Sequence, residues 1–171
     1  MTKEGKVILS IIIGTIFVVG VLAFLMTKAS SSSGGDSFVL NVEAVSLNVD
    51  PSEGMDLGSV SYGGGKVTKS FEVKNTYDHD IKLRKITTSC MCTTAKFVID
   101  GKESKDYGME MNGDLNPLID FDFPADSTAQ VVFTFDPAAH GPQGIGPFDR
   151  VVTMFFDTGY KEFRFGGVVT K

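Results

Sequence analysis

From residue 38 onward, apolar and polar side chains alternate along the chain, and this alternation restricts the fold more than any other feature. In "KVTKSFEVKN", Val67, Phe71 and Val73 share one face, while the residues between them are mostly polar. Successive side chains of a β-strand point to opposite faces of the sheet, so the pattern is typical of a half-buried strand. No stretch after residue 38 has a convincing helical period, and we therefore predict an all-β domain.

Glycine, proline, asparagine and aspartate separate the alternating segments and indicate turns between about seven to nine short strands. A lone sheet cannot bury both faces, so two packed sheets, a β-sandwich, are the predicted architecture. Asp100-Gly101 and Thr158-Gly159 are expected to be hairpin turns. The segments expected to hold strands are residues 38–49, 66–75, 80–86, 97–103, 117–123, 128–137 and 149–167.

The N-terminal segment contains a run of twenty uncharged, mostly apolar residues, 7–26. At 1.5 Å per residue, a helix of this length spans about 30 Å, the thickness of a hydrocarbon core. We predict one transmembrane helix within residues 1–28, acting as an uncleaved signal anchor, then a Ser/Gly linker (29–37) and the sandwich domain (38–171). The expected topology is single-pass, with a cytoplasmic N-terminus and an extracellular or periplasmic C-terminal domain.

The charge balance restricts the partners of this chain. The net charge is −5, and residues 1–28 carry three lysines and one glutamate, so the remaining residues carry −7. An acidic domain without a basic run argues against nucleic acid as a partner. The expected partners are the lipid bilayer, through residues 7–26, and other proteins of the cell envelope.

The chain contains four motifs in the order found in a known family: "MDLGSV", "KSFEVKNTYDHDIKLRKITTSCMCTTAKF", "FPADSTAQVVFTFDP" and "GPFDRVVTMFF". The chain resembles the bacterial domain of unknown function family 1573, Ig-like sandwiches related to Hydin-type (ASH) domains, over roughly residues 55–168. The resemblance implies an Ig-like fold and an extracytoplasmic location, and it implies no reaction. The matching positions are Asp56, Gly58, Val60, Phe71, Val73, Asn75, Ser89, Cys90, Cys92, Thr93, Pro124, Val131, Phe133 and Pro137.

The chain departs from the pattern of this family at two turns and in one insertion. Met91 stands where a glycine is usual between the two cysteines. Ala125-Asp126 replaces the usual Pro-Gly turn, and residues 101–116 form a longer polar stretch that looks like an insertion.

Cys90 and Cys92 are the two cysteines of the chain, and they allow several interpretations. On an extended strand their Cα atoms would lie about 6.5–7 Å apart, at the limit for a disulfide, so a bridge needs a tight local bend. The pair can be structural, as core thiols or a strained local disulfide, or it can be a redox pair or part of a metal site. An oxidising compartment would disfavour two exposed free thiols.

A metal site would need ligands beyond these two thiolates. His79, His140, Met91, Met109 and Met111 are the further imidazole and thioether candidates, and this combination of soft ligands would suit copper as Cu(I). No spacing between cysteines or histidines supports zinc. No cofactor is expected otherwise.

Asn112, Asp114 and Asn116 have the alternating oxygen spacing of a calcium loop. Pro117 and Phe123 stand where an EF-hand requires glycine and glutamate, so a solvated turn is the simpler interpretation.

We find no catalytic constellation in the sequence. The first hypothesis is therefore a membrane-anchored, non-enzymatic module that mediates protein–protein contacts or cell-surface assembly. The alternative is a copper-binding or thiol-redox protein centred on Cys90 and Cys92. A third option is a filament or pilus-like subunit assembled through its N-terminal helix.

Overall fold

The computed structural model describes residue 45 and residues 47–171. These residues form ten strands and one short 3₁₀ turn, more strands than the seven to nine predicted. The strand Met55–Ser61 lies outside all the segments expected to hold strands. The elements are β1 (Asn48–Asp50), β2 (Met55–Ser61), β3 (Val67–Lys74), β4 (Ile81–Thr88), β5 (Thr93–Ile99), β6 (Lys102–Glu103), β7 (Phe121–Phe123), β8 (Thr128–Phe135), η1 (Gly141–Gly144), β9 (Gly146–Phe156) and β10 (Gly159–Thr170).

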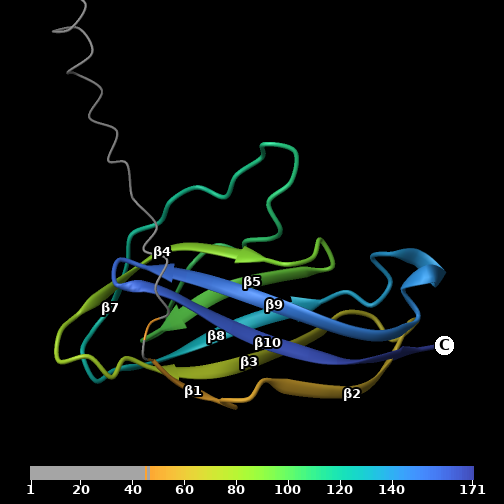
Figure 1. Ribbon diagram of the computed structural model, residues 1–171, viewed down its shortest axis with the longest axis horizontal. Helices are drawn as coiled ribbons and strands as arrows, with labels where there is room; N and C mark the ends of the chain where they lie inside the picture. The colour runs from red at the N-terminus through yellow and green to blue at the C-terminus, as the bar shows by residue number, and fades with distance from the viewer. Residues whose placement is uncertain (1–44, 46) are drawn as a thin grey trace, which may run out of the picture. The chain divides into compact units, whose positions relative to one another are not determined.

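The ten strands form two five-stranded sheets, which confirms the predicted β-sandwich (Figure 1). One sheet has the order β1-β3-β8-β5-β6, and the other has the order β2-β10-β9-β4-β7. Neighbouring strands are antiparallel except for β2 and β10, which are parallel. Because β4 and β5 belong to different sheets, the turn between them carries the chain from one sheet to the other.

Phenylalanines from both sheets fill the space between them. Phe133 of β8 stacks on Phe165 of β10 with ring centroids 4.1 Å apart, and Phe71 of β3 lies 5.6 Å from Phe163 of β10. All four side chains are at most 1% exposed. Each buried phenylalanine contributes about 1.5–3 kcal/mol, so these contacts hold the sheets together.

The burial along β3 confirms the alternation read from the sequence. Phe71 and Val73 are buried, Val67 is half-buried, and the residues between them are exposed. The hairpin turn between β5 and β6 is also confirmed, because Asp100 and Gly101 have φ of 49° and 74°, as a type I′ turn requires. The turn between β9 and β10 uses Asp157 and Thr158, so Gly159 already belongs to β10.

The predicted N-terminal features lie outside the described residues. These are the transmembrane helix within 1–28, the linker 29–37, and the first part of the expected strand 38–49. Among the residues described, no helix is long and apolar enough to cross a membrane. The membrane topology and the filament hypothesis therefore stay predictions.

Asn75 is fully buried just after β3, and its side chain joins three segments of backbone. Its Nδ2 lies 3.1 Å from the carbonyl oxygen of His79, 2.9 Å from that of Phe123 and 3.0 Å from that of Pro124. Its Oδ1 accepts a hydrogen bond from the Tyr77 amide at 3.0 Å. Through these bonds the Asn75 side chain joins the end of β3 to the turn before β4 and to the end of β7.

Replacing Asn75 with alanine should lower the free energy of unfolding by about 2–4 kcal/mol, because buried carbonyl groups would lose their donor. Urea unfolding monitored by tyrosine fluorescence measures the change. Asn48→Ala is the matched control, since Asn48 is exposed on β1, and it should change stability by no more than about 0.5 kcal/mol. Equal effects of the two substitutions would contradict this role.

Candidate functional site

The turn between β4 and β5 joins Cys90 and Cys92 in a disulfide. Their Cα atoms lie 5.2 Å apart, closer than an extended strand would place them, because the chain bends and the Thr93 amide donates to the Cys90 carbonyl at 3.1 Å. Met91 is not among the described non-glycine residues with positive φ. The bend therefore does not require the glycine that is usual at this position.

Asp126, in the other turn that departs from the family pattern, has a positive φ, unlike Met91. Its φ is 56°, in the left-handed region that glycine adopts most easily. Aspartate is one of the few other residues that enter this region readily, which explains how it can replace glycine in this turn.

Both sheets hold the cysteine turn in place. Ser89 and Val151 of β9 form two hydrogen bonds of 2.9 Å, one from the Ser89 amide to the Val151 carbonyl and one from the Val151 amide to the Ser89 hydroxyl. On the other side, the Asp136 amide, just after β8, donates to the Cys92 carbonyl at 2.8 Å. The turn is therefore fixed to the framework independently of the disulfide.

The two sulfur atoms have different neighbours. Cys90 is 6% exposed, and its Sγ lies 3.0 Å from Nε2 of His140. Cys92 is 2% exposed, and its Sγ accepts a hydrogen bond from Nε of Arg150 at 3.2 Å. One sulfur thus contacts an imidazole and the other contacts a permanent positive charge.

His140 lies in the connection between β8 and β9, and Arg150 is the fifth of the eleven residues of β9. His140 immediately precedes η1. The guanidinium of Arg150 is positioned by a 2.7 Å hydrogen bond from Nη1 to the Asp149 carbonyl, and it lies 6.0 Å from the ring centroid of Phe148. Sequence reasoning missed Arg150, because an isolated arginine near a strand start gives no signal until the pairing of β4 with β9 is known.

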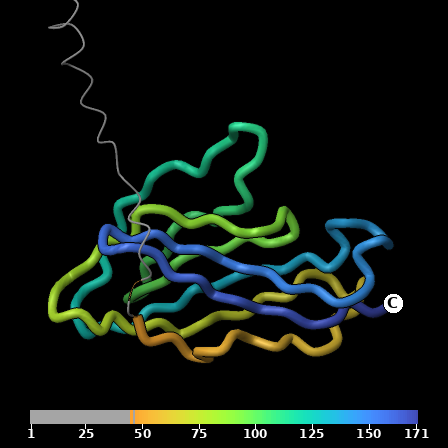
Figure 2. Tube along the Cα trace, in the orientation of Figure 1, coloured from red at the N-terminus to blue at the C-terminus, as the bar shows by residue number. Residues whose placement is uncertain are grey.

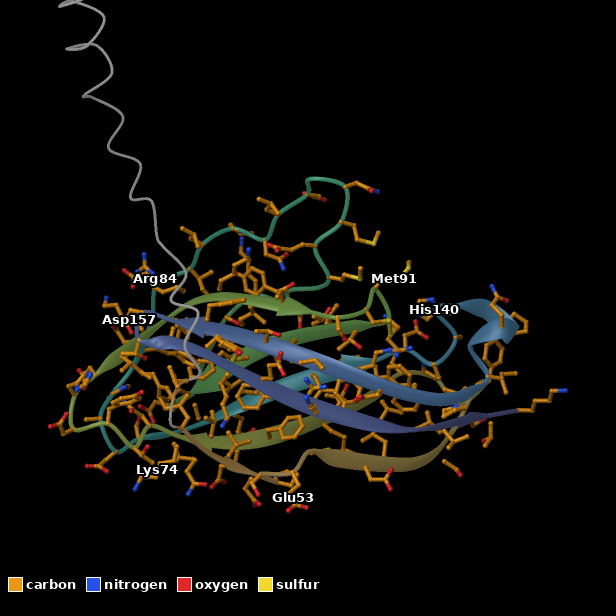
Figure 3. The ribbon with its side chains drawn as sticks, in the orientation of Figure 1. Glu53, Lys74, Arg84, Met91, His140 and Asp157 are labelled. Carbon is orange, nitrogen blue, oxygen red and sulfur yellow. A yellow bond between two sulfur atoms is a disulfide. The ribbon has the colours of Figure 1, made fainter. Side chains whose placement is uncertain are left out.

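A hollow of about 320 Å³ lies beside the disulfide, and we call it the disulfide hollow. Figure 3 shows Met91 and His140 near each other at this end of the domain. The lining residues are Ser89, Cys90, Met91, Met109, Met111, His140 and Arg150.

The structure thus brings most of the proposed copper ligands together. Within the described part of the chain, one group of three cysteine, histidine or acidic side chains is close enough to hold a metal ion. It comprises Cys90, Cys92 and His140, whose ligand atoms lie within 4.8 Å of one another. Met91, Met109 and Met111 line the adjoining hollow.

His79 lies elsewhere, in the turn before β4. Its Nδ1 is 2.8 Å from Oδ1 of Asp78, and its ring is 5.3 Å from that of Tyr77. The hydrogen bond from His79 lowers the pKa of the Asp78 carboxyl. Because these contacts are exposed, they indicate a solvated surface turn.

The proposed calcium residues differ in exposure and in contacts. Asn112 and Asp114 are exposed, whereas Asn116 is half-buried and donates from Nδ2 to the carbonyls of Ile86 at 3.0 Å and Gly108 at 2.8 Å. The Asn116 side chain is therefore a structural link in this segment.

Asn116 belongs to the segment between β6 and β7, residues 104–120, whose middle part projects away from the sheets (Figure 2). We call it the 104–120 loop. Tyr107 exchanges two backbone hydrogen bonds of 2.8 Å with Ala95 of β5. Glu110 forms a 2.8 Å ion pair with Lys85, and both side chains are mostly buried. These contacts give the loop a defined conformation despite its length.

Exposed apolar side chains gather at this loop. Among the described residues, six large apolar side chains are exposed, and five of them lie on the 104–120 loop or on the cysteine turn. The sixth, Val168, lies on β10. We call the five the apolar surface: Met91, Met109, Met111, Leu115 and Leu118.

Comparison with known families confirms the resemblance for part of the chain. Residues 49–106 match the family described as "Protein of unknown function (DUF1573)". The DUF1573 match covers about a third of the chain. It includes the disulfide but not His140, Arg150, Met109 or Met111, so this segment alone does not contain the whole site. No curated protein is significantly similar to the chain.

Solved structures resemble the chain in fold at low sequence identity. A protein of unknown function from Porphyromonas gingivalis W83 is 11% identical, with a TM-score of 0.53; the match covers 80% of this chain and 51% of that protein. The ASH/PapD-like domain 7 of human CEP192 is 13% identical with a TM-score of 0.36, and 75% and 87% of the two chains are covered. The first of these supports the sandwich fold and nothing further.

Reduction of the disulfide should leave the domain folded. The closed loop spans only three residues, so the disulfide restricts the unfolded chain little. It adds only about 1.6 kcal/mol to the free energy of unfolding. In urea unfolding, addition of a reductant should lower the midpoint of the transition and leave its slope unchanged. The Cys90→Ser/Cys92→Ser variant is the control and should not respond to reductant. Unfolding of the wild-type domain on reduction alone would contradict the expectation.

Replacing Asn116 with alanine should loosen the 104–120 loop, because the carbonyls of Ile86 and Gly108 would lose their donor. Amide hydrogen exchange within the loop should become faster, while exchange in β8 and β9 stays unchanged. Asp114→Asn alters an exposed side chain of the same loop and serves as control. A loop equally protected in both variants would show that Asn116 does not hold it.

Proposed function

We propose that this chain is a membrane-anchored, extracytoplasmic, Ig-like binding module without enzymatic activity, and that it docks another envelope protein through the apolar surface. Within residues 47–171, five of the six exposed large apolar side chains lie on one loop and the adjoining turn, and this observation carries the proposal. Soluble domains rarely concentrate exposed apolar side chains unless these meet a partner.

The 104–120 loop is prepared for binding by its internal contacts. The Lys85–Glu110 ion pair and the hydrogen bonds of Asn116 define its conformation before any partner arrives, which reduces the entropy lost on association. Three of the five apolar side chains are methionines. Their flexible, polarisable thioethers adapt to the shape of a partner.

Charge favours a protein over a lipid surface as the partner of the loop. Residues 104–120 contain one lysine and four acidic residues. Glu110 pairs with Lys85, and Asp120 pairs with Lys82 and Arg84, so this region carries no excess of positive charge that would attract anionic phospholipid headgroups. A protein with an apolar patch bordered by basic side chains would fit this loop.

The proposed anchor would keep the docking surface close to the membrane. The Ser/Gly composition of residues 29–37 is typical of a linker that joins an anchor to a folded domain. Partners anchored in the same membrane, or exposed on the same envelope surface, would thus be present at high effective concentration.

Site-specific photo-crosslinking in cells that produce the full chain tests the docking surface. A photoreactive amino acid at position 115 should yield a discrete crosslinked species, because Leu115 is 68% exposed at the proposed interface. The same group at position 168 is the matched control, since Val168 is exposed elsewhere. It should yield no such species.

A second substitution shows whether the crosslink depends on the apolar surface. Met111→Ser and Leu118→Ser together should reduce the yield from position 115 by about tenfold, because they remove apolar area from the interface. Equal yields from positions 115 and 168, or a yield insensitive to the double substitution, would rule out docking at this surface.

A further inference from the structure

The disulfide hollow places two sulfurs, an imidazole and three thioethers at one end of the domain. We propose that an external dithiol reduces the Cys90–Cys92 disulfide and that the reduced domain then binds one Cu(I) ion through Cys90, Cys92 and His140. This metal site goes beyond the docking function and does not depend on it.

The arrangement of the two sulfurs directs how the disulfide opens. Cys90 lines the hollow, so a thiolate of the external dithiol attacks its Sγ there and forms a mixed disulfide. The Cys90–Cys92 bond breaks, and Cys92 leaves as a thiolate beside the guanidinium of Arg150. A positive charge at the leaving sulfur stabilises the thiolate and favours this direction of cleavage.

The second thiol of the reductant completes the transfer. It attacks the reductant's other sulfur atom, the one bonded to Cys90 in the mixed disulfide, and releases Cys90 as a thiolate next to His140. Two electrons pass to the domain, the dithiol departs as a disulfide, and its two protons go to the cysteines or to solvent. When Cu(I) binds both sulfurs as thiolates, any protons on them are released to solvent.

The framework keeps the released thiols in place. The bonds of Ser89 to β9, and of the Cys92 carbonyl to the Asp136 amide, involve no sulfur atom and remain after reduction. The ligand atoms of Cys90, Cys92 and His140 already lie within 4.8 Å of one another. Two ligands that bind one ion at about 2.3 Å are at most about 4.6 Å apart, so the three groups can share one ion once the sulfur–sulfur bond has opened and the two sulfurs have moved apart.

The ligand set favours Cu(I) over zinc. Zinc sites usually have four ligands from cysteine, histidine and carboxylates. The group found in the described residues has only three such ligands, and Met91, Met109 and Met111, which line the same hollow, carry thioethers, a ligand type that selects Cu(I).

Charge also fits the monovalent ion. Two thiolates and one Cu(I) leave a net charge of −1, and Arg150 at 3.2 Å from the Cys92 sulfur compensates it. A divalent ion with the same ligands would give a neutral centre beside an uncompensated arginine.

The test uses the full-length chain in detergent, reduced with a dithiol that is then removed without oxygen. A coloured Cu(I) chelator of known affinity supplies Cu(I), and its loss of colour measures the transfer. The reduced protein should take up one Cu(I) per chain, whereas the oxidised protein and a Cys90→Ser/Cys92→Ser variant should take up none. Equal uptake by the reduced wild type and this variant would overturn the proposal.

Substitutions of the two histidines resolve the ligand set. His140→Gln should lower the affinity for Cu(I) by at least about tenfold and remove the nitrogen ligand from the copper X-ray absorption spectrum. His79→Gln is the matched control, because His79 lies in the exposed turn before β4, and it should change neither result. An unchanged spectrum in His140→Gln would exclude His140 as a ligand. Because crosslinking from position 115 needs neither reduction nor copper, failure here leaves the docking test unaffected.

Discussion

The contact between phenylalanines of opposite sheets is the interaction on which the rest of this structure depends. Phe133 and Phe165 stack face to face, and Phe71 and Phe163 pack beside them, so that β3 and β8 are held against β10. This packing sets the separation and alignment of the two sheets. This core therefore fixes the positions of both ends of every segment that connects the two sheets.

The cysteine turn is one of these connections, which explains why side chains distant in the sequence surround its two sulfurs. β4 belongs to one sheet and β5 to the other, and the turn is bonded to β9 on one side and to the residue after β8 on the other. The connection from β8 to β9, which carries His140, and β9, which carries Arg150, meet it there. An imidazole and a guanidinium thus reach the two sulfurs of a disulfide that spans only three residues.

The two proposed activities use overlapping surfaces. Met91, Met109 and Met111 belong both to the apolar surface and to the lining of the disulfide hollow. A protein docked on the 104–120 loop would therefore cover the access to the sulfurs. Binding of a partner and exposure of the site to reductant or metal would then compete, and each would shift the equilibrium of the other.

Local patterns in the sequence determined much of the fold, because side-chain alternation and turn residues act over a few neighbouring positions. They predicted the two-sheet sandwich, the buried face of β3 and the Asp100-Gly101 turn, and residue chemistry pointed to Cys90, Cys92, His140 and the methionines as candidate ligands. Only the tertiary structure decided which candidates meet: it separated His79 from the others, engaged Asn116 in holding a loop, and brought Arg150 to Cys92. These contacts join residues distant in sequence, so they depend on how the strands pair and on how the two sheets pack.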